Sequence, residues 1–178
     1  MLKSFTVENI KELEQLEQKL YESMDKTLLQ ISSEITLNSS QILFSKMKFG
    51  GIGFDPLDSD RKLNLIEQIN QSFTYLASFY ALEILFAEYP ELAPFKLNLG
   101  TAAGSDIESE CGGLAAEVFA AVAPTSNQKL KKDINKVLET NARLKFVFFM
   151  CPNFELGRQP KLEREGVTVW ALKGTNLL

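Results

Sequence analysis

One short run of residues, Phe146-Val147-Phe148-Phe149-Met150, constrains the fold more than any other part of the chain. Side chains on a strand point alternately to the two faces of a sheet, so a strand that is apolar at every position must be covered on both faces. The run therefore predicts a central strand with helices on either side, and an α/β protein. Leu114 to Val122 is nearly as apolar, with Glu117 as its one charged residue.

The other segments predict helices and shorter strands around this centre. Apolar residues at intervals of three and four predict a helical segment over about residues 6–48, broken at Asn38-Ser39-Ser40, and a long helix over about 59–88. Short strands are expected over 95–99, around 106–108 and over 167–172, with a helix opening at 125. A helix between two strands favours a parallel crossover. The predicted order is helix, three strands, helix, strand, strand.

The length of 178 residues favours one domain. We expect residues 1–53 to form an N-terminal helical extension and residues 54–178 to form the α/β core. The glycine cluster that ends the extension, at residues 50–53, follows no predicted strand and lacks the Gly-Lys-Ser/Thr ending of a phosphate loop. It therefore predicts a flexible connection and not a nucleotide site.

The composition excludes several classes of function. The chain has no histidine, so a catalytic triad with a histidine base and a His-Glu-x-x-His zinc helix are both excluded. Two cysteines cannot complete a four-ligand zinc site, and they fit a reducing compartment. Neither a membrane-spanning apolar run nor a signal-peptide core is apparent. We expect a cytoplasmic protein without membrane association, whose chemistry uses carboxylates, lysines, hydroxyls and hard metal ions.

The single charge in an apolar strand, Glu117, requires an explanation, because an unpaired buried carboxylate is costly. Asp106, Glu108 and Glu110 precede it across the turn at residues 111–113, on the expected antiparallel neighbour, where alternation puts them on one face. Two adjacent strands would bring carboxylates within a few ångströms, where a divalent cation neutralises them. A structural ion pair between Glu117 and a lysine or arginine is the alternative.

These residues resemble a known pattern. The long helix, the strand, Gly-Ser-Asp-Ile-Glu-Ser, the turn, Ala-Glu-Val-Phe and the basic helix together resemble the PD-(D/E)XK nuclease superfamily over about residues 59–172. The resemblance implies a restriction endonuclease-like core with added N-terminal helices. It also implies a Mg²⁺ site in which Asp106 is the first acid, Glu117 the second and the Val118 carbonyl a further ligand. Glu67 would match the additional acid that some members carry on the long helix.

Two positions depart from the family pattern. Ser105 stands where the family has proline, and Phe119 stands where it has the catalytic lysine. Some members take that lysine from the following helix, so the resemblance implies Lys129 as its replacement. The implied function is Mg²⁺-dependent phosphodiester hydrolysis acting on DNA, with weak or absent activity in the isolated protein. The alternative is a non-enzymatic nucleic-acid-binding or assembly module that retains the fold.

Two further surfaces suggest partners. Between Lys129 and Lys145 the chain carries six basic and two acidic side chains, which can face DNA or can be a solvated helix face. The N-terminal segment has an apolar stripe that must be buried, either on the core or in a homodimer. Its intervals show no sustained heptad, so a long coiled coil is disfavoured. The stripe is Ile10, Leu13, Leu20, Met24, Leu28, Ile31 and Ile35.

Overall fold

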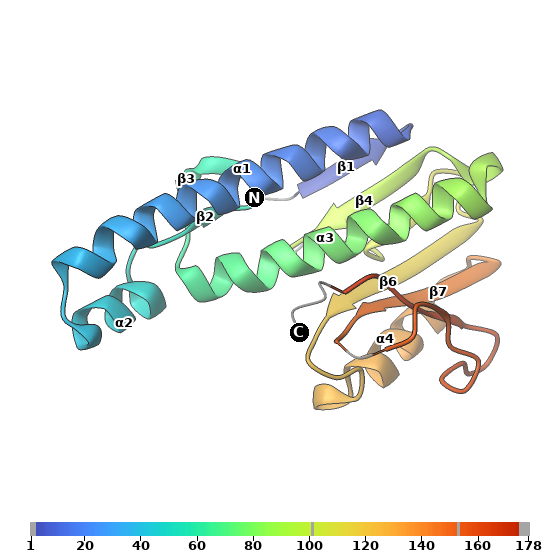
Figure 1. The fold of residues 1–178 in the computed structure, drawn as a ribbon. Coiled ribbons are helices and arrows are strands. Elements are labelled where there is room, and N and C mark those ends of the chain that lie inside the picture. Colours follow the sequence, from blue (N-terminus) through green and yellow to red (C-terminus); the bar gives the residue numbers. More distant parts are fainter. Residues whose placement is uncertain (1–2, 101, 153, 175–178) are drawn as a thin grey trace. The chain divides into compact units, whose positions relative to one another are not determined.

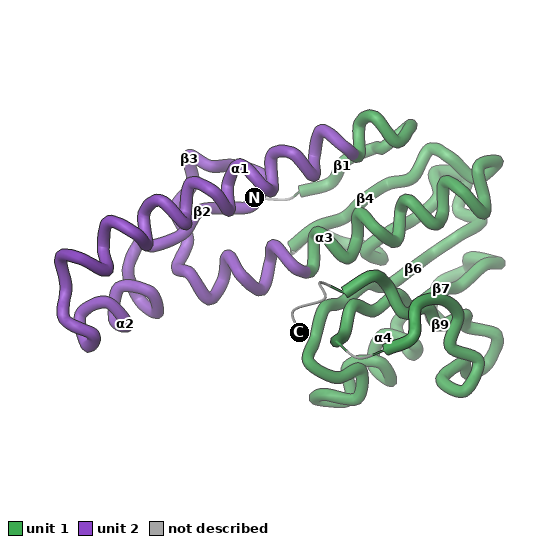
Figure 2. Tube along the Cα trace, in the orientation of Figure 1, with its two compact units in different colours: residues 1–13, 74–178 green, residues 14–73 purple. Residues whose placement is uncertain are grey.

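The computed structural model describes residues 3–100, 102–152 and 154–174, and it confirms a mixed α/β protein (Figure 1). The chain forms two compact units (Figure 2). Residues 1–13 and 74–178 form the sheet unit, and residues 14–73 form the helical unit. The expected boundary at residue 53 falls inside the helical unit. None of the helices in the described ranges combines the length and the apolar composition that crossing a bilayer requires.

The sheet unit contains a seven-stranded mixed sheet in the order β1-β4-β5-β6-β7-β9-β8. Each of the first four strands in this order is antiparallel to its neighbour among these four, β6, β7 and β9 are parallel, and β8 is antiparallel to β9. The strands are β1 (Lys3–Val7), β4 (Phe95–Leu99), β5 (Ile107–Ser109), β6 (Leu114–Ala120), β7 (Leu144–Met150), β8 (Gly157–Arg158) and β9 (Thr168–Ala171).

The apolar strand β7 lies between β6 and β9, as its composition predicts, and Phe146 to Met150 are all buried. Helix α4 (Lys129–Leu138) connects β6 to the parallel β7 and packs on one face of the sheet. On the other face, residues 74–88 of α3 (Leu65–Glu88) pack, and the Phe86 and Phe95 rings meet edge to face with centroids 5.1 Å apart. The short 3-10 helices η1 (Pro90–Leu92) and η2 (Ser126–Gln128) precede β4 and α4.

Two predicted helix starts are wrong. The prediction of helix from about residue 6 misses β1, which pairs with β4 along its whole length, because strand pairing decides the structure of a segment too short for a helical period. The long helix begins at Leu65 and not at residue 59. A hairpin of β2 (Phe54–Asp55) and β3 (Asp58–Lys62) precedes it, and Asn64 caps the helix by accepting the backbone N–H of Glu67 at 2.9 Å.

The helical unit contains residues 14–37 of α1 (Ile10–Leu37), α2 (Ser40–Phe49), the β2–β3 hairpin and residues 65–73 of α3. The predicted helix break at residues 38–40 is confirmed. The buried side of α1 runs through Leu16, Leu20, Ser23 and Thr27, whereas Leu28 and Ile35 of the predicted stripe are exposed. Helix α1 turns this side inward because polar residues form part of the core there. Gln68 Oε1 accepts hydrogen bonds from Thr27 Oγ1 at 2.6 Å and from the backbone N–H of Phe54 at 2.8 Å.

Candidate functional site

The candidate site lies on a row of residues that crosses four strands of the sheet unit. The pairing of Ile107 with Ala116, continued by one residue, sets Asp106 opposite Glu117, just before β5 begins. The backbone N–H of Asn98 donates to the Asp106 carbonyl at 2.8 Å, and Ser4 on β1 is paired with Asn98. Residues directly opposite on antiparallel strands have Cβ atoms about 4.5–5.5 Å apart. The structure therefore brings Asp106 and Glu117 together, as the sequence predicts.

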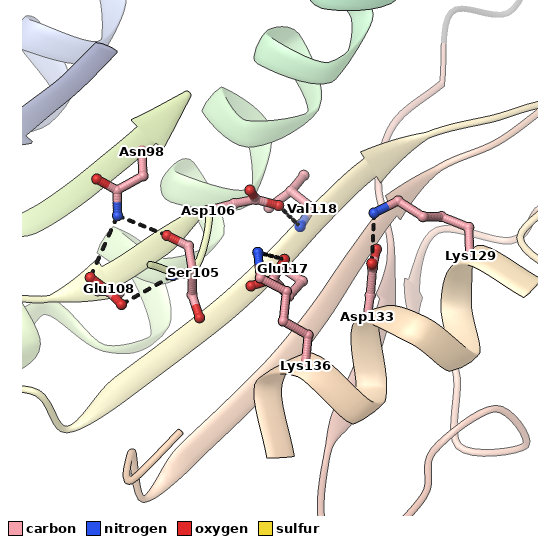
Figure 3. Close-up of polar contacts among 9 residues, drawn as sticks. All are labelled: Asn98, Ser105, Asp106, Glu108, Glu117, Val118, Lys129, Asp133 and Lys136. Atoms are coloured by element: carbon pink, nitrogen blue, oxygen red, sulfur yellow. Dashed lines mark hydrogen bonds and ion pairs between the residues drawn. The ribbon is translucent and has the colours of Figure 1, made fainter. Parts of the chain in front are cut away.

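A hydrogen-bond network holds the loop that carries Asp106 (Figure 3). Asn98 Nδ2 donates to the Ser105 carbonyl at 2.8 Å, and Ser4 Oγ donates to Asn98 Oδ1 at 2.8 Å. Glu108 Oε1 accepts the backbone N–H of Ser105 at 3.1 Å. At Gly104, with φ +103°, a Cβ atom would lie 3.0 Å from Glu108 Oε1, so the loop fits closely over this carboxylate. Asp106 Oδ2 itself accepts the backbone N–H of Val118 at 2.7 Å.

Replacing the buried Asn98 by alanine is expected to destabilise the protein by about 1–3 kcal/mol, because the Ser105 carbonyl would be left without its buried donor. Urea unfolding of the purified variant measures the change. Asn135→Ala, at an exposed position of α4, is the matched control and should change the free energy of unfolding by no more than about 0.5 kcal/mol. Equal effects of the two substitutions would contradict a stabilising role for the hydrogen bond from Asn98 to Ser105.

Helix α4 directs Lys136 to the carboxylate pair and Lys129 to Asp133 (Figure 3). Lys136 Nζ contacts Glu117 Oε2 at 2.7 Å, although half of the lysine side chain stays exposed. About two helical turns before it, Lys129 Nζ pairs with Asp133 Oδ1 at 2.6 Å and lies 5.7 Å from the centre of the Phe119 ring. Residues 129, 133 and 136 follow the spacing of one helix face, so all three side chains point toward β6.

Burial disfavours the charged form of the carboxyl groups in this cluster and raises their pKa values. Burial, followed by the neighbouring Asp106 charge, raises the pKa of Glu117 to about 7, although Lys136 acts in the opposite direction. Burial likewise raises the pKa of Asp106 and of Asp133. Burial tends to lower the pKa of Lys136, but Glu117, Asp106 and Asp133 outweigh it and hold that pKa above its usual value. The Asp106–Glu117 pair therefore binds a proton below about pH 7 and loses it as the pH rises through that value.

This raised pKa predicts how stability depends on pH. Between the ordinary value of 4.5 and about 7, the folded protein holds a proton on Glu117 that the unfolded chain has lost, so stability falls as pH rises through this window. Glu117→Gln removes that dependence. The stability of the variant relative to the parent should therefore increase by about 1–3 kcal/mol from about pH 5 to about pH 8. Urea unfolding across the range measures this, and parallel pH profiles would contradict it.

The other predicted site residues, Lys129 and Glu67, make no direct contact with Asp106 or Glu117 among the hydrogen bonds and ion pairs of the described residues. Lys129 acts on Asp106 through space, but its ammonium group contacts Asp133. Glu67 belongs to the helical unit, where its side chain is exposed on the first turn of α3. Phe119 is buried under α4 and stacks with Phe149, which explains why this position holds an aromatic residue. The catalytic role of Lys129 and the metal-ligand role of Glu67 stay predictions.

Sequence reasoning missed Lys136 and Asp133. A signal for them is present: Lys129, Asp133 and Lys136 each precede one member of the apolar stripe Leu130, Ile134 and Val137. Charged residues that border a buried stripe at the same spacing lie at the edge of the packed face, close to any charge on the facing strand. Because Glu117 is the one charged residue of the facing strand, a lysine at the edge of this stripe could be expected to pair with it.

The basic segment divides between two roles. Lys129 and Lys136 contact the acidic cluster, and Lys145 Nζ donates to the Leu138 carbonyl at 2.9 Å. Lys131, Lys132 and Arg143 are exposed. The segment therefore combines a solvated face with lysines directed to the candidate site, and DNA contact through it stays a prediction.

Two oxygens in the cluster are buried without a donor. Glu117 Oε1 and Asp133 Oδ2 accept no hydrogen bond from the residues that the structure describes. Within those ranges, no group of three or more acidic or cysteine side chains is arranged to hold a metal ion. Asp106 and Glu117 are thus two carboxylates without a third acid beside them in the described ranges, and the Val118 carbonyl stays a predicted further ligand. This number suits Mg²⁺, which is commonly held by one or two carboxylates and keeps several waters.

Comparison with known proteins adds no assignment to this geometry. No protein-family model, no curated protein and no solved structure matches the chain.

Proposed function

We propose that the protein is a Mg²⁺-dependent phosphodiester hydrolase with a restriction endonuclease-like core, and that DNA is its substrate. The observation that carries the proposal is the meeting of Asp106 and Glu117 on adjacent strands, beside Lys136 of α4. The order of α3, β4, β5, β6, α4 and β7 supports it, because the resemblance implies a helix, three strands, a helix and further strands.

The fit of a cation rests on the buried oxygens. Glu117 Oε1 lacks a donor, and burial raises the pKa of both Asp106 and Glu117, so a positive charge placed between the two carboxylates would relieve a real cost. A Mg²⁺ ion held by Asp106 and Glu117 would polarise the phosphodiester and activate a water molecule for attack.

The protein's own residues supply the remaining functions. The network of Asn98, Ser105 and Glu108 fixes the loop before β5, so that Asp106 keeps its orientation. Lys136, with its raised pKa, stays protonated and provides positive charge where negative charge develops on the phosphoryl oxygens. Glu117 loses its proton near neutral pH, so its affinity for a cation should rise with pH through about 7.

Cleavage of DNA by the purified full-length protein tests the proposal. Supercoiled plasmid, linear duplex and single-stranded DNA are incubated with Mg²⁺ or Mn²⁺, and with EDTA as the control. The proposal expects slow cleavage of at least one form, which EDTA abolishes. Absence of cleavage in every form with both ions would remove the hydrolase function.

A non-enzymatic nucleic-acid-binding module is the second candidate. The direct contact of Lys136 with Glu117 favours it, since an ion pair of this kind can stabilise a buried acid with no metal present. The two candidates differ in their need for a cation. Metal-independent DNA binding without any cleavage would support this second function.

A further inference from the structure

The helical unit exposes most of the large apolar side chains that the structure leaves uncovered. Of the thirteen exposed large hydrophobic residues in the described ranges, ten lie within residues 14–73. A concentration of exposed large apolar side chains in one part of a protein indicates an interaction site. Seven of these residues lie on the end of α1 and on α2, and we call them the apolar tip: Leu28, Leu29, Ile35, Leu37, Ile42, Phe44 and Phe49.

Helix α2 has the most exposed apolar composition in the helical unit. It has ten residues and none of them is buried, although half are Ile42, Leu43, Phe44, Met47 and Phe49. Phe44 is 71% exposed and Phe49 is 82% exposed. An isolated helix shorter than about 12–15 residues is marginal in water and depends on packing for its stability. Helix α2 therefore offers apolar area that a partner can cover.

Polar contacts hold the apolar tip in place within the helical unit. Lys46 on α2 pairs with Glu34 on α1 at 2.7 Å. Gln30 donates to the Gly51 carbonyl at 2.9 Å and accepts the backbone N–H of Gly53 at 3.2 Å. These bonds fix the two helix ends against the segment that follows α2. A surface fixed in advance loses less conformational entropy when it binds.

We propose that the apolar tip is a homodimer interface, in which α1 and α2 of one copy pack on the same helices of a second copy. A two-fold interface must be self-complementary, so its centre must not repel itself. Residues 27–49 contain only three charged side chains, and two of them, Glu34 and Lys46, neutralise each other. The third, Lys48, leaves the tip nearly neutral. An identical apolar surface is a fitting partner for such a surface.

Charge argues against the other partner classes. Residues 14–73 carry nine acidic and six basic side chains, and the whole chain has a net charge of −4. Nucleic acids and anionic membrane surfaces both attract clusters of lysine and arginine, which this unit lacks. The proposal is independent of the hydrolase function, because every residue in it lies outside the candidate site.

The test is the mass of the full-length protein in solution across a range of concentrations, measured by light scattering and analytical ultracentrifugation. The proposal expects a dimer for the parent protein. The double substitution Phe44→Glu with Phe49→Glu should weaken self-association on the order of a hundredfold or more, since buried aromatic anchors dominate such interfaces. Both side chains are exposed in the single chain, so the variant should keep its circular dichroism spectrum.

Val122→Glu is the matched control, because Val122 is 84% exposed and lies in the sheet unit. It should leave the dimer unchanged. A parent protein that stays monomeric at every concentration would overturn the proposal, and so would a dimer that both glutamates leave intact. Flotation of a monomeric parent with lipid vesicles, lost in the double variant, would assign the apolar tip to a membrane surface and would equally overturn the proposal.

Discussion

Asp106→Asn is expected to lower metal-dependent DNA cleavage by at least about 10²–10⁴-fold, to the level of the EDTA control. The substitution keeps the shape of the side chain and can still accept the Val118 N–H, but it removes one of the two carboxylates that face each other across β5 and β6. It also removes the charge that helps to raise the pKa of Glu117. The measurement is the single-turnover cleavage rate with Mg²⁺ or Mn²⁺.

Glu110→Gln is the control for this experiment. Glu110 is an exposed acid directly after β5, so its replacement changes the net charge equally but leaves the pair intact. Its cleavage rate should match that of the parent protein. A variant at Asp106 that cleaves as fast as the Glu110 variant would show that the pair takes no part in catalysis.

Lys136→Ala is expected to lower the cleavage rate by about 10²–10³-fold, and more than Lys129→Ala does. Lys136 contacts Glu117 directly, whereas Lys129 contacts Asp133. Loss of Lys136 also removes a charge that lowers the pKa of Glu117, so the rising limb of the pH–rate profile should move to higher pH. Lys136→Arg should restore part of the rate.

Lys132→Ala, at an exposed position of the same helix, controls for a general loss of positive charge. If Lys132→Ala and Lys136→Ala lowered the rate equally, with no shift in the pH profile, the role of α4 would be limited to attracting DNA. If Lys129→Ala had the larger effect, the family pattern of a lysine at the start of the helix would describe the site better than the Glu117 contact does.

The centre of the sheet unit could be predicted from sequence because its signals are local and strong. A fully apolar strand must be central, and the structure sets Phe146 to Met150 between two parallel neighbours. One charge in an apolar strand, with acids across a short turn, predicts the approach of Asp106 and Glu117. Both inferences depend on alternation along strands, which a sequence displays directly.

Other features depend on contacts between distant residues. β1 forms because the edge of β4 is available to it, and nothing within Lys3–Val7 requires that pairing. Leu28 and Ile35 have the spacing of a buried stripe. The hydrogen bonds of Gln68 with Ser23 and Thr27 instead favour burial of the side of α1 that carries these two polar residues. Lys136 could be recognised only after Glu117 had been assigned to the strand under α4. In each case the deciding partner lies far away in the chain.

The central claim is that Asp106 and Glu117 hold a divalent cation, and paramagnetic broadening by Mn²⁺ tests it most directly. Backbone amide resonances of the full-length protein are followed by NMR during a Mn²⁺ titration above pH 7, where Glu117 is largely ionised. The account predicts selective broadening around residues 105–108 and 116–119, which Glu117→Gln removes. Broadening centred on other acids, such as Asp58 and Asp60, or the same broadening in the Glu117→Gln variant, would contradict it.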